Sequence, residues 1–164
     1  MPRYYTVTWD QLHRDAKALA WRLVGKGPVE GGFNGIVAIT RGGLIPAAIV
    51  ARELDCRLIE SVSVVTYDEE EMGQPRVVKP PAAAGDGTGW LVLDDLVDTG
   101  TTAKVVRAIL PRAHFATIYA KPAGRPLVDS FITEVSQDTW ILFPWDTEPQ
   151  FVAPIIKTAA AGGA

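Results

Sequence analysis

Cysteine is nearly absent from this chain of 164 residues, in which Cys56 is the only thiol. A single cysteine excludes both an internal disulfide framework and a zinc site built from cysteines. Long apolar runs are missing too, because no stretch approaches the ~18 apolar residues of a membrane helix and the N-terminus lacks the apolar core of a signal peptide. These absences predict a cytoplasmic protein that neither spans a membrane nor is secreted.

An excess of basic residues is also absent. Lysine and arginine together number 16 against 19 aspartates and glutamates, which leaves a net charge of -3 at pH 7. Such a chain has no broad electrostatic attraction for nucleic acid or for anionic lipid. We therefore expect no nucleic-acid partner, and any phosphate group that the protein binds must be met by local groups.

The residues that are present are typical of a globular protein, with 48% hydrophobic and 21% charged side chains. The length is that of one ordinary domain, long enough to bury roughly two thirds of the surface that the unfolded chain exposes. The sequence shows neither an internal repeat nor a boundary between domains. A single domain over residues 1–164 is the prediction.

Hydrophobic periodicity alternates between helix and strand along the chain. The pattern predicts helices over residues 9–24, 44–54 and 102–110, and strands over residues 35–40, 57–66, 90–93 and 114–120. This order favours an α/β fold, a Rossmann-like parallel sheet flanked by helices, with ligands bound beyond the carboxyl ends of the strands. Residues 67–89 are rich in proline and glycine and too long for an ordinary connection, which predicts a flexible flap.

The most informative segment is an apolar strand that leads into paired acids and then into a Thr-Gly-Thr-Thr turn, residues 90–102. Backbone N–H groups of Thr99, Gly100, Thr101 and Thr102, at the start of a helix, can encircle a phosphate. Asp94 and Asp95 can divide their work between ribose hydroxyls and a hydrated Mg²⁺ ion. The alternatives are that the two acids simply end a strand and that the segment from Asp98 to Gly100 is a turn and helix cap.

A second strand-to-helix turn lies upstream, in the sequence Thr40-Arg41-Gly42-Gly43. Glycines let the backbone approach an anion closely, and the planar fork of Arg41 can chelate a pair of pyrophosphate oxygens. An exposed loop arginine is the alternative.

Together the two segments resemble the binding signature of the type I phosphoribosyltransferases. The resemblance implies that Arg41 and Gly42 contact pyrophosphate, that Asp94 contacts ribose and that Asp95 serves the Mg²⁺ cofactor. It assigns the 5-phosphate of 5-phosphoribosyl-1-pyrophosphate to residues 99–102. It also implies a cis peptide bond between Thr40 and Arg41, although the bacterial relatives have serine where Thr40 stands.

Two further segments, residues 121–126 and 137–146, bear on the acceptor base. Lys121 leaves a strand on the ligand side, where a cation can donate to an exocyclic purine oxygen, and adenine has no such oxygen. Trp140 offers a face for stacking, with core packing as its alternative. These segments resemble the bacterial xanthine-guanine members of the family, in which they form a small hood over the base. The resemblance implies that Asp98 faces the base N7, Lys121 the 6-oxygen and Ile141, through its backbone, the base.

The resemblance implies a purine salvage enzyme that converts guanine, xanthine and, more weakly, hypoxanthine into GMP, XMP and IMP. Asp98 would act as a general base or hold the proton of the base, and both roles stay open. The family also implies a homotetramer, or at least a dimer, and leaves open a weak peripheral association with the inner face of the cell membrane. The alternatives are a hypoxanthine-preferring enzyme, an orotate or uracil enzyme, and a non-catalytic nucleotide-sensing regulator of the same fold.

Overall fold

The computed structural model describes residues 1–28, 32–66, 74–146 and 155–157. Its backbone contacts divide the chain into two units, one of His13–Gln137 and the other of Met1–Leu12 with Asp138–Ala164. None of the helices in these described ranges has the length and apolarity needed to span a bilayer.

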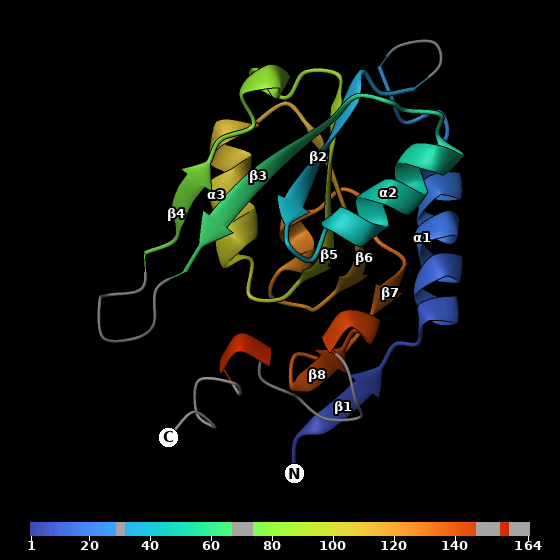
Figure 1. Cartoon of the computed structure of the whole chain (residues 1–164), viewed down its shortest axis with the longest axis vertical. Coiled ribbons are helices and arrows are strands. Elements are labelled where there is room, and N and C mark those ends of the chain that lie inside the picture. The colour runs from blue at the N-terminus through green and yellow to red at the C-terminus, as the bar shows by residue number, and fades with distance from the viewer. Residues whose placement is uncertain (29–31, 67–73, 147–154, 158–164) are drawn as a thin grey trace. The chain divides into compact units, whose positions relative to one another are not determined.

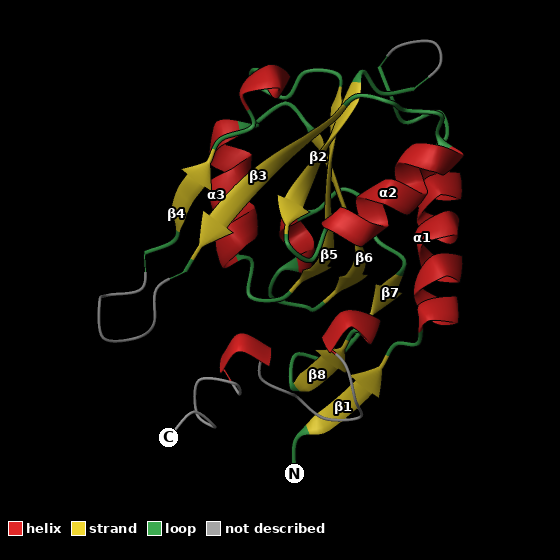
Figure 2. Cartoon of the chain, viewed as in Figure 1, coloured by secondary structure: helices red, strands yellow, loops and turns green. Residues whose placement is uncertain are grey.

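The larger unit is built on a sheet whose described strands number six, in the order β4-β3-β2-β5-β6-β7 (Figure 2). Their bounds are β2 Gly35–Thr40, β3 Ile59–Val65, β4 Arg76–Lys79, β5 Trp90–Val97, β6 His114–Ala120 and β7 Thr133–Glu134. All neighbouring strands are parallel except β3 and β4. The predicted α/β fold with a parallel central sheet is therefore confirmed, whereas the two edge strands β4 and β7 were not predicted.

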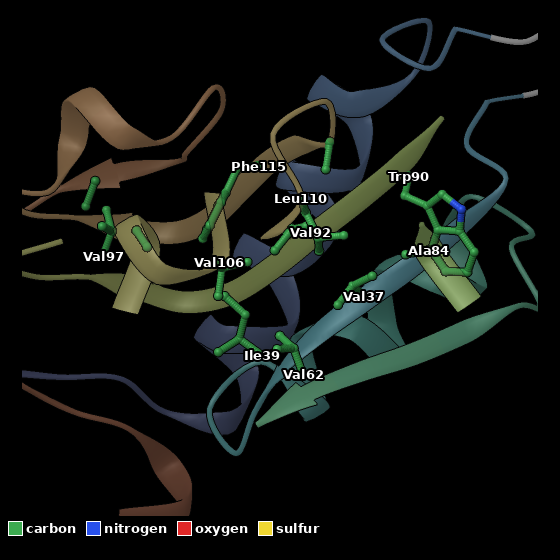
Figure 3. Close-up of a cluster of buried hydrophobic side chains, with 13 residues drawn as sticks. Val37, Ile39, Val62, Ala84, Trp90, Val92, Val97, Val106, Leu110 and Phe115 are labelled. Carbon is green, nitrogen blue, oxygen red and sulfur yellow. The ribbon is translucent and has the colours of Figure 1, made fainter. Parts of the chain in front are cut away.

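One face of this sheet carries the cluster shown in Figure 3. Val37, Val92 and Phe115 stand side by side on three adjacent strands and are at most 2% exposed. Against them packs α3 (Thr101–Ile109) through Val106 and the following Leu110. Because side chains alternate along a strand, the intervening apolar residues face the other way. Figure 1 shows α1 (Trp9–Leu23) and α2 (Leu44–Glu53) on that opposite side.

The central elements lie close to their predicted bounds. Helices α1 and α2 each end one residue before the predicted limit, and β2 and β6 match the prediction. The exception is β5, which continues to Val97, four residues beyond the predicted end, because β6 pairs with it as far as Val97 and Ala120. The paired acids therefore lie inside a strand and not after it.

The predicted flap falls partly outside the described residues, which exclude 67–73. Its remainder contains β4 and a short 3-10 helix, η2 (Ala82–Ala84). Strand β4 runs antiparallel to β3, with Val77 opposite Val64, and its end residues Arg76 and Lys79 are flanked by Pro75 and Pro80. Proline at the ends of an edge strand is well tolerated because no ladder hydrogen bond is lost there.

The smaller unit contains a parallel pair of strands, β1 (Arg3–Thr6) and β8 (Thr139–Leu142). Neither strand was predicted, because each has only four residues and its partner lies at the other end of the chain. Next to them, the rings of Phe143 and Trp145 stack with centroids 4.8 Å apart, and Trp9 meets Trp145 edge-on. The short 3-10 helix η4 (Pro144–Asp146) closes the turn, since Asp146 accepts a hydrogen bond from the Phe143 N–H at 2.9 Å.

Candidate active site

A cavity of about 370 Å³ opens in the larger unit, beyond the carboxyl end of β5 and at the start of α3. Its wall consists of Thr66, Asp94, Phe115 and residues 96–103. This is the edge of the sheet at which the strand order predicts ligand binding. The wall brings together the predicted ribose contact, the predicted 5-phosphate turn and Asp98.

The two acids of β5 lie on opposite sides of the strand. Asp94 lines the cavity, and its Oδ1 accepts a hydrogen bond from the Asp95 N–H at 2.9 Å. The Asp95 carboxylate instead packs against Gly42, so closely that a Cβ atom at residue 42 would overlap it. Burial, and then the negative charge of Asp95, raise the pKa of Asp94 well above its usual range.

The turn after β2 contacts β5 at two glycines, Gly42 and Gly43. The peptide bond between Thr40 and Arg41 is cis, as the resemblance implied. A Cβ atom at Gly43 would lie 2.5 Å from the Leu93 carbonyl oxygen, so only glycine allows the turn to approach β5 this closely. The Arg41 side chain is exposed beside this turn. Neither Arg41 nor Gly42 belongs to the cavity wall, and it is the contact of Gly42 with Asp95 that joins the two predicted segments.

The Thr-Gly-Thr-Thr turn forms the floor of the cavity. Gly100 has φ +89°, a left-handed conformation, and it precedes the first residue of α3. The first N–H groups of a helix have no acceptor within the helix, so those of Thr101 and Thr102 can meet an anion. The hydroxyls of Thr99 and Thr101 lie 3.1 Å apart and add polar groups at the same place.

Asp98 does not cap α3. The residue at the cap position is Gly100, and no side chain hydrogen-bonds to the free N–H groups there. Asp98 instead accepts a hydrogen bond from the Lys121 ammonium at 3.0 Å, and the Lys121 side chain is only 7% exposed. The capping alternative is therefore wrong for Asp98. Asp98, expected at the five-membered ring of the base, and Lys121, expected at the six-membered ring, therefore form an ion pair.

Sequence reasoning missed a third member of this group, Gln137. Its side-chain amide donates to the other oxygen of Asp98 at 2.7 Å. Residue 137 begins the predicted segment 137–146, but nothing in the sequence pairs its side chain with Asp98, 39 positions away.

Trp140 and Ile141 lie in β8, which belongs to the smaller unit. The Trp140 side chain is 58% exposed, so the core-packing alternative is wrong. Its neighbour across the strand pair is Tyr4, which is 61% exposed and was not predicted as a functional residue. Ile141 is buried, with only 6% of its surface exposed, so its backbone is the part that a ligand could contact.

A complete metal site is not present among the described residues, in which no three acidic, histidine or cysteine side chains converge. Mg²⁺ does not need one, since it keeps several waters and is held by one or two carboxylates together with phosphate oxygens of a substrate. Asp95 fits that description, because its carboxylate oxygens are hard ligands.

These features define a class of protein, an α/β protein that binds a phosphorylated ligand at the carboxyl edge of a parallel sheet. Residues 8–151 match the family model of the phosphoribosyl transferase domain, and the chain belongs to this family.

Named relatives agree with this assignment. The xanthine-guanine phosphoribosyltransferase of Gluconobacter oxydans is 64% identical, over 94% of this chain and 92% of that protein. The enzyme of the same name from Desulfotalea psychrophila is 63% identical, over 94% and 93%. A solved structure of purine phosphoribosyltransferase from Pyrococcus horikoshii superposes with a TM-score of 0.77 at 25% identity, covering 92% of this chain and 99% of that one.

Proposed function

We propose that this chain is a xanthine-guanine phosphoribosyltransferase of purine salvage. It transfers the phosphoribosyl group of 5-phosphoribosyl-1-pyrophosphate to guanine, xanthine and, more weakly, hypoxanthine, and releases pyrophosphate with GMP, XMP or IMP. The observation that carries the proposal is the pairing of Asp98 with Lys121 directly beside the phosphate-binding turn. Relatives of the same name at more than 60% identity support it.

The pair matches the edge of an oxopurine. When N9 is the nucleophile, the proton of the imidazole ring resides on N7, next to the 6-oxygen. A carboxylate accepts from the first and an ammonium donates to the second. Adenine carries an amino group in place of the 6-oxygen. That amino group is a hydrogen-bond donor, so it would face a second donor, the Lys121 ammonium. The arrangement therefore selects 6-oxopurines and disfavours the orotate and uracil alternatives.

The sugar phosphate is held along the edge of the sheet. Residues 99–102 surround the 5-phosphate with N–H groups and hydroxyls, and Asp94 accepts from the ribose hydroxyls. Arg41 and the Gly42 backbone bind the pyrophosphate. These roles follow from the chemistry of each group and from its place at the end of β2 or β5.

Asp95 holds Mg²⁺ in this proposal. A bound Mg²⁺ ion would neutralise charge on the pyrophosphate leaving group, which accumulates as the bond between the anomeric carbon and the pyrophosphate oxygen breaks. The residues of the chain contribute the rest of the stabilisation, because Arg41 lies near the departing pyrophosphate and the β5 carboxylates near the positive ribose ring. Asp98 holds or removes the N7 proton as N9 attacks the anomeric carbon.

Trp140 stacks on the base and the Ile141 backbone contacts its edge. An exposed indole in a short strand is available for stacking without a change in the core. We also propose the homotetramer, or at least a dimer, of the family. A cytoplasmic location and a weak peripheral membrane association remain predictions.

A steady-state comparison of bases tests the proposal. With 5-phosphoribosyl-1-pyrophosphate and Mg²⁺ present, we expect turnover of guanine and xanthine, slower turnover of hypoxanthine and none above background with adenine. Faster turnover of hypoxanthine than of guanine would establish the hypoxanthine-preferring alternative. Nucleotide binding without turnover of any base would establish the regulator.

A further inference from the structure

Gln137 joins three separate parts of the larger unit through one side chain. Its Nε2 donates to Asp98 Oδ1 at 2.7 Å, and its Oε1 accepts from the Ala123 N–H at 2.9 Å. The other carboxylate oxygen of Asp98 accepts from Lys121 Nζ at 3.0 Å. The carboxylate is therefore held from two sides by two different donors, one neutral and one cationic.

The backbone prepares this arrangement. The Lys121 N–H donates to the Val97 carbonyl at 2.9 Å, which ties the end of β6 to the end of β5. The Lys121 carbonyl then accepts from the N–H groups of Gly124 at 3.1 Å and of Arg125 at 2.9 Å, which closes a turn. Within this turn the Ala123 N–H is left to the Gln137 amide oxygen. Each end of that amide thus has a partner of the correct polarity, which fixes its orientation.

We propose that Gln137 is a positioning residue for the base-binding pair. It fixes the plane of the Asp98 carboxylate and prevents Lys121 from bonding to both carboxylate oxygens. An ammonium has three N–H donors, so Lys121 then keeps a donor for the 6-oxygen of the base while one is used by Asp98. This inference rests on the proposed function, in which Asp98 and Lys121 contact the oxopurine.

The physical need for such a residue lies in the softness of the aspartate side chain. The final torsion of a carboxylate has a broad energy profile, so a single partner leaves the plane of the group free to turn. Asp98 is about half exposed, with a side-chain exposure of 47%, and packing alone does not hold it. A catalytic group needs an orientation fixed within roughly 10–20° to remain productive. The second bond, from Gln137, supplies that constraint without adding a charge beside the ion pair.

Two substitutions separate positioning from structure. Gln137→Met removes both hydrogen bonds, whereas Gln137→Glu keeps an acceptor for the Ala123 N–H and loses the donor to Asp98. We expect both variants to lower kcat/KM for guanine by roughly ten- to hundred-fold, the order expected for one lost hydrogen bond to a charged group. The KM for 5-phosphoribosyl-1-pyrophosphate should change little. If Gln137 only stabilises the turn, Gln137→Met should lower kcat/KM for both substrates to a similar extent.

A double-mutant cycle with Asp98→Asn then identifies the route of the effect, since the extra charge of Gln137→Glu does not enter it. Asp98→Asn alone should lower turnover by roughly a hundred- to ten-thousand-fold. In that background Gln137→Met should cost less than two-fold, because the carboxylate through which it acts is gone. The matched control is Gln11→Met, which removes a glutamine bonded to the Tyr5 hydroxyl and should leave the kinetics unchanged.

The outcomes distinguish two failures. In the first, Asp98→Asn lowers turnover as expected, but Gln137→Met lowers the rate by the same factor in wild type and in Asp98→Asn. That result overturns the positioning role and leaves the proposed function intact. An unchanged rate in Asp98→Asn overturns the role of Asp98 itself, and with it the basis of the inference.

Discussion

Two neighbouring carboxylates on β5 do different work because a strand turns successive side chains to opposite faces. Asp94 faces the cavity beside the phosphate-binding turn, and Asp95 faces the glycine turn after β2. The proposed sugar contact and the proposed metal contact thus come from adjacent residues on opposite faces of the strand. The absence of a side chain at Gly42 is what leaves room for the Asp95 carboxylate.

Asp95→Asn should weaken the response to Mg²⁺ while leaving the fold intact. The amide has the shape of the carboxylate and fits against Gly42, but it lacks the charge that a hard divalent cation requires. We expect the Mg²⁺ concentration at half-maximal rate to rise roughly ten-fold or more, with a thermal midpoint near that of wild type. Titrations of rate against Mg²⁺ measure this effect. Asp55→Asn, at an exposed residue whose carboxylate lies 4.0 Å from the Arg57 guanidinium, serves as the control. An unchanged Mg²⁺ response in Asp95→Asn would contradict the metal assignment.

At the scale of elements, the edge of the sheet depends on a polar link between β3 and the segment after it. Glu60 on β3 accepts from the Lys79 ammonium of β4 and, at 3.2 Å, from the Ala83 N–H of η2. The hydrogen bond from Lys79, and then those from the Ser61 and Ala83 N–H groups, lower the pKa of Glu60 to about 2. An acid with a lowered pKa stabilises the folded state above its ordinary pKa near 4.5, and this contribution is lost as the pH falls toward 2.

Glu60→Gln should therefore destabilise the protein at neutral pH and not in acid. Because Lys79 is partly exposed and the pair is screened by solvent, we expect a loss of at most ~1 kcal/mol, or ~2–4 °C in Tm, at pH 7. The difference between the variant and wild type should shrink steadily as the pH is lowered from 4.5 toward 2. Thermal unfolding across this pH range measures the difference. The control is Glu53→Gln, which removes an ion pair between the adjacent residues Arg52 and Glu53. A difference that does not depend on pH would contradict this origin.

At the scale of the whole molecule, the larger unit leaves apolar side chains on its surface. Trp21 is 77% exposed, and Leu58 and Ile59 are 52% and 49% exposed. Large exposed apolar groups that gather on a surface favour association with another surface. A small α/β domain gains stability by burying such groups between copies of itself.

Light scattering should therefore give a mass that is a multiple of the 17.7 kDa chain, at four copies or at least two. A dilution series at micromolar concentrations, together with Tm at each concentration, measures the assembly, because the Tm of an oligomer rises with protein concentration. A mass of one chain that persists at the highest concentration would contradict the prediction.

Much of the fold and of the site follows from local sequence patterns. Helical spacing identified α1, and short β-rich runs of mostly apolar residues identified the buried parallel strands β2 and β6, because burial on both faces favours such runs. The turn around Gly100 was predicted because a glycine, threonine hydroxyls and a helix start all occur within residues 99–102. The strands β1, β4, β7 and β8 were missed, since runs of two to four residues become strands only through their partners.

The sequence by itself determined the class of the fold, the place of the turn at residues 99–102 and the chemical types of the groups proposed to meet the base, because each of these depends on neighbours in the chain. Only the tertiary structure decided which carboxylate faces the cavity, which one faces Gly42 and how Asp98 is held. The extension of β5 is imposed by pairing with β6, and it places Asp94 and Asp95 on opposite faces. The bond from Gln137 to Asp98 joins residues 39 positions apart, and such contacts exist only after the strands between them have been brought together.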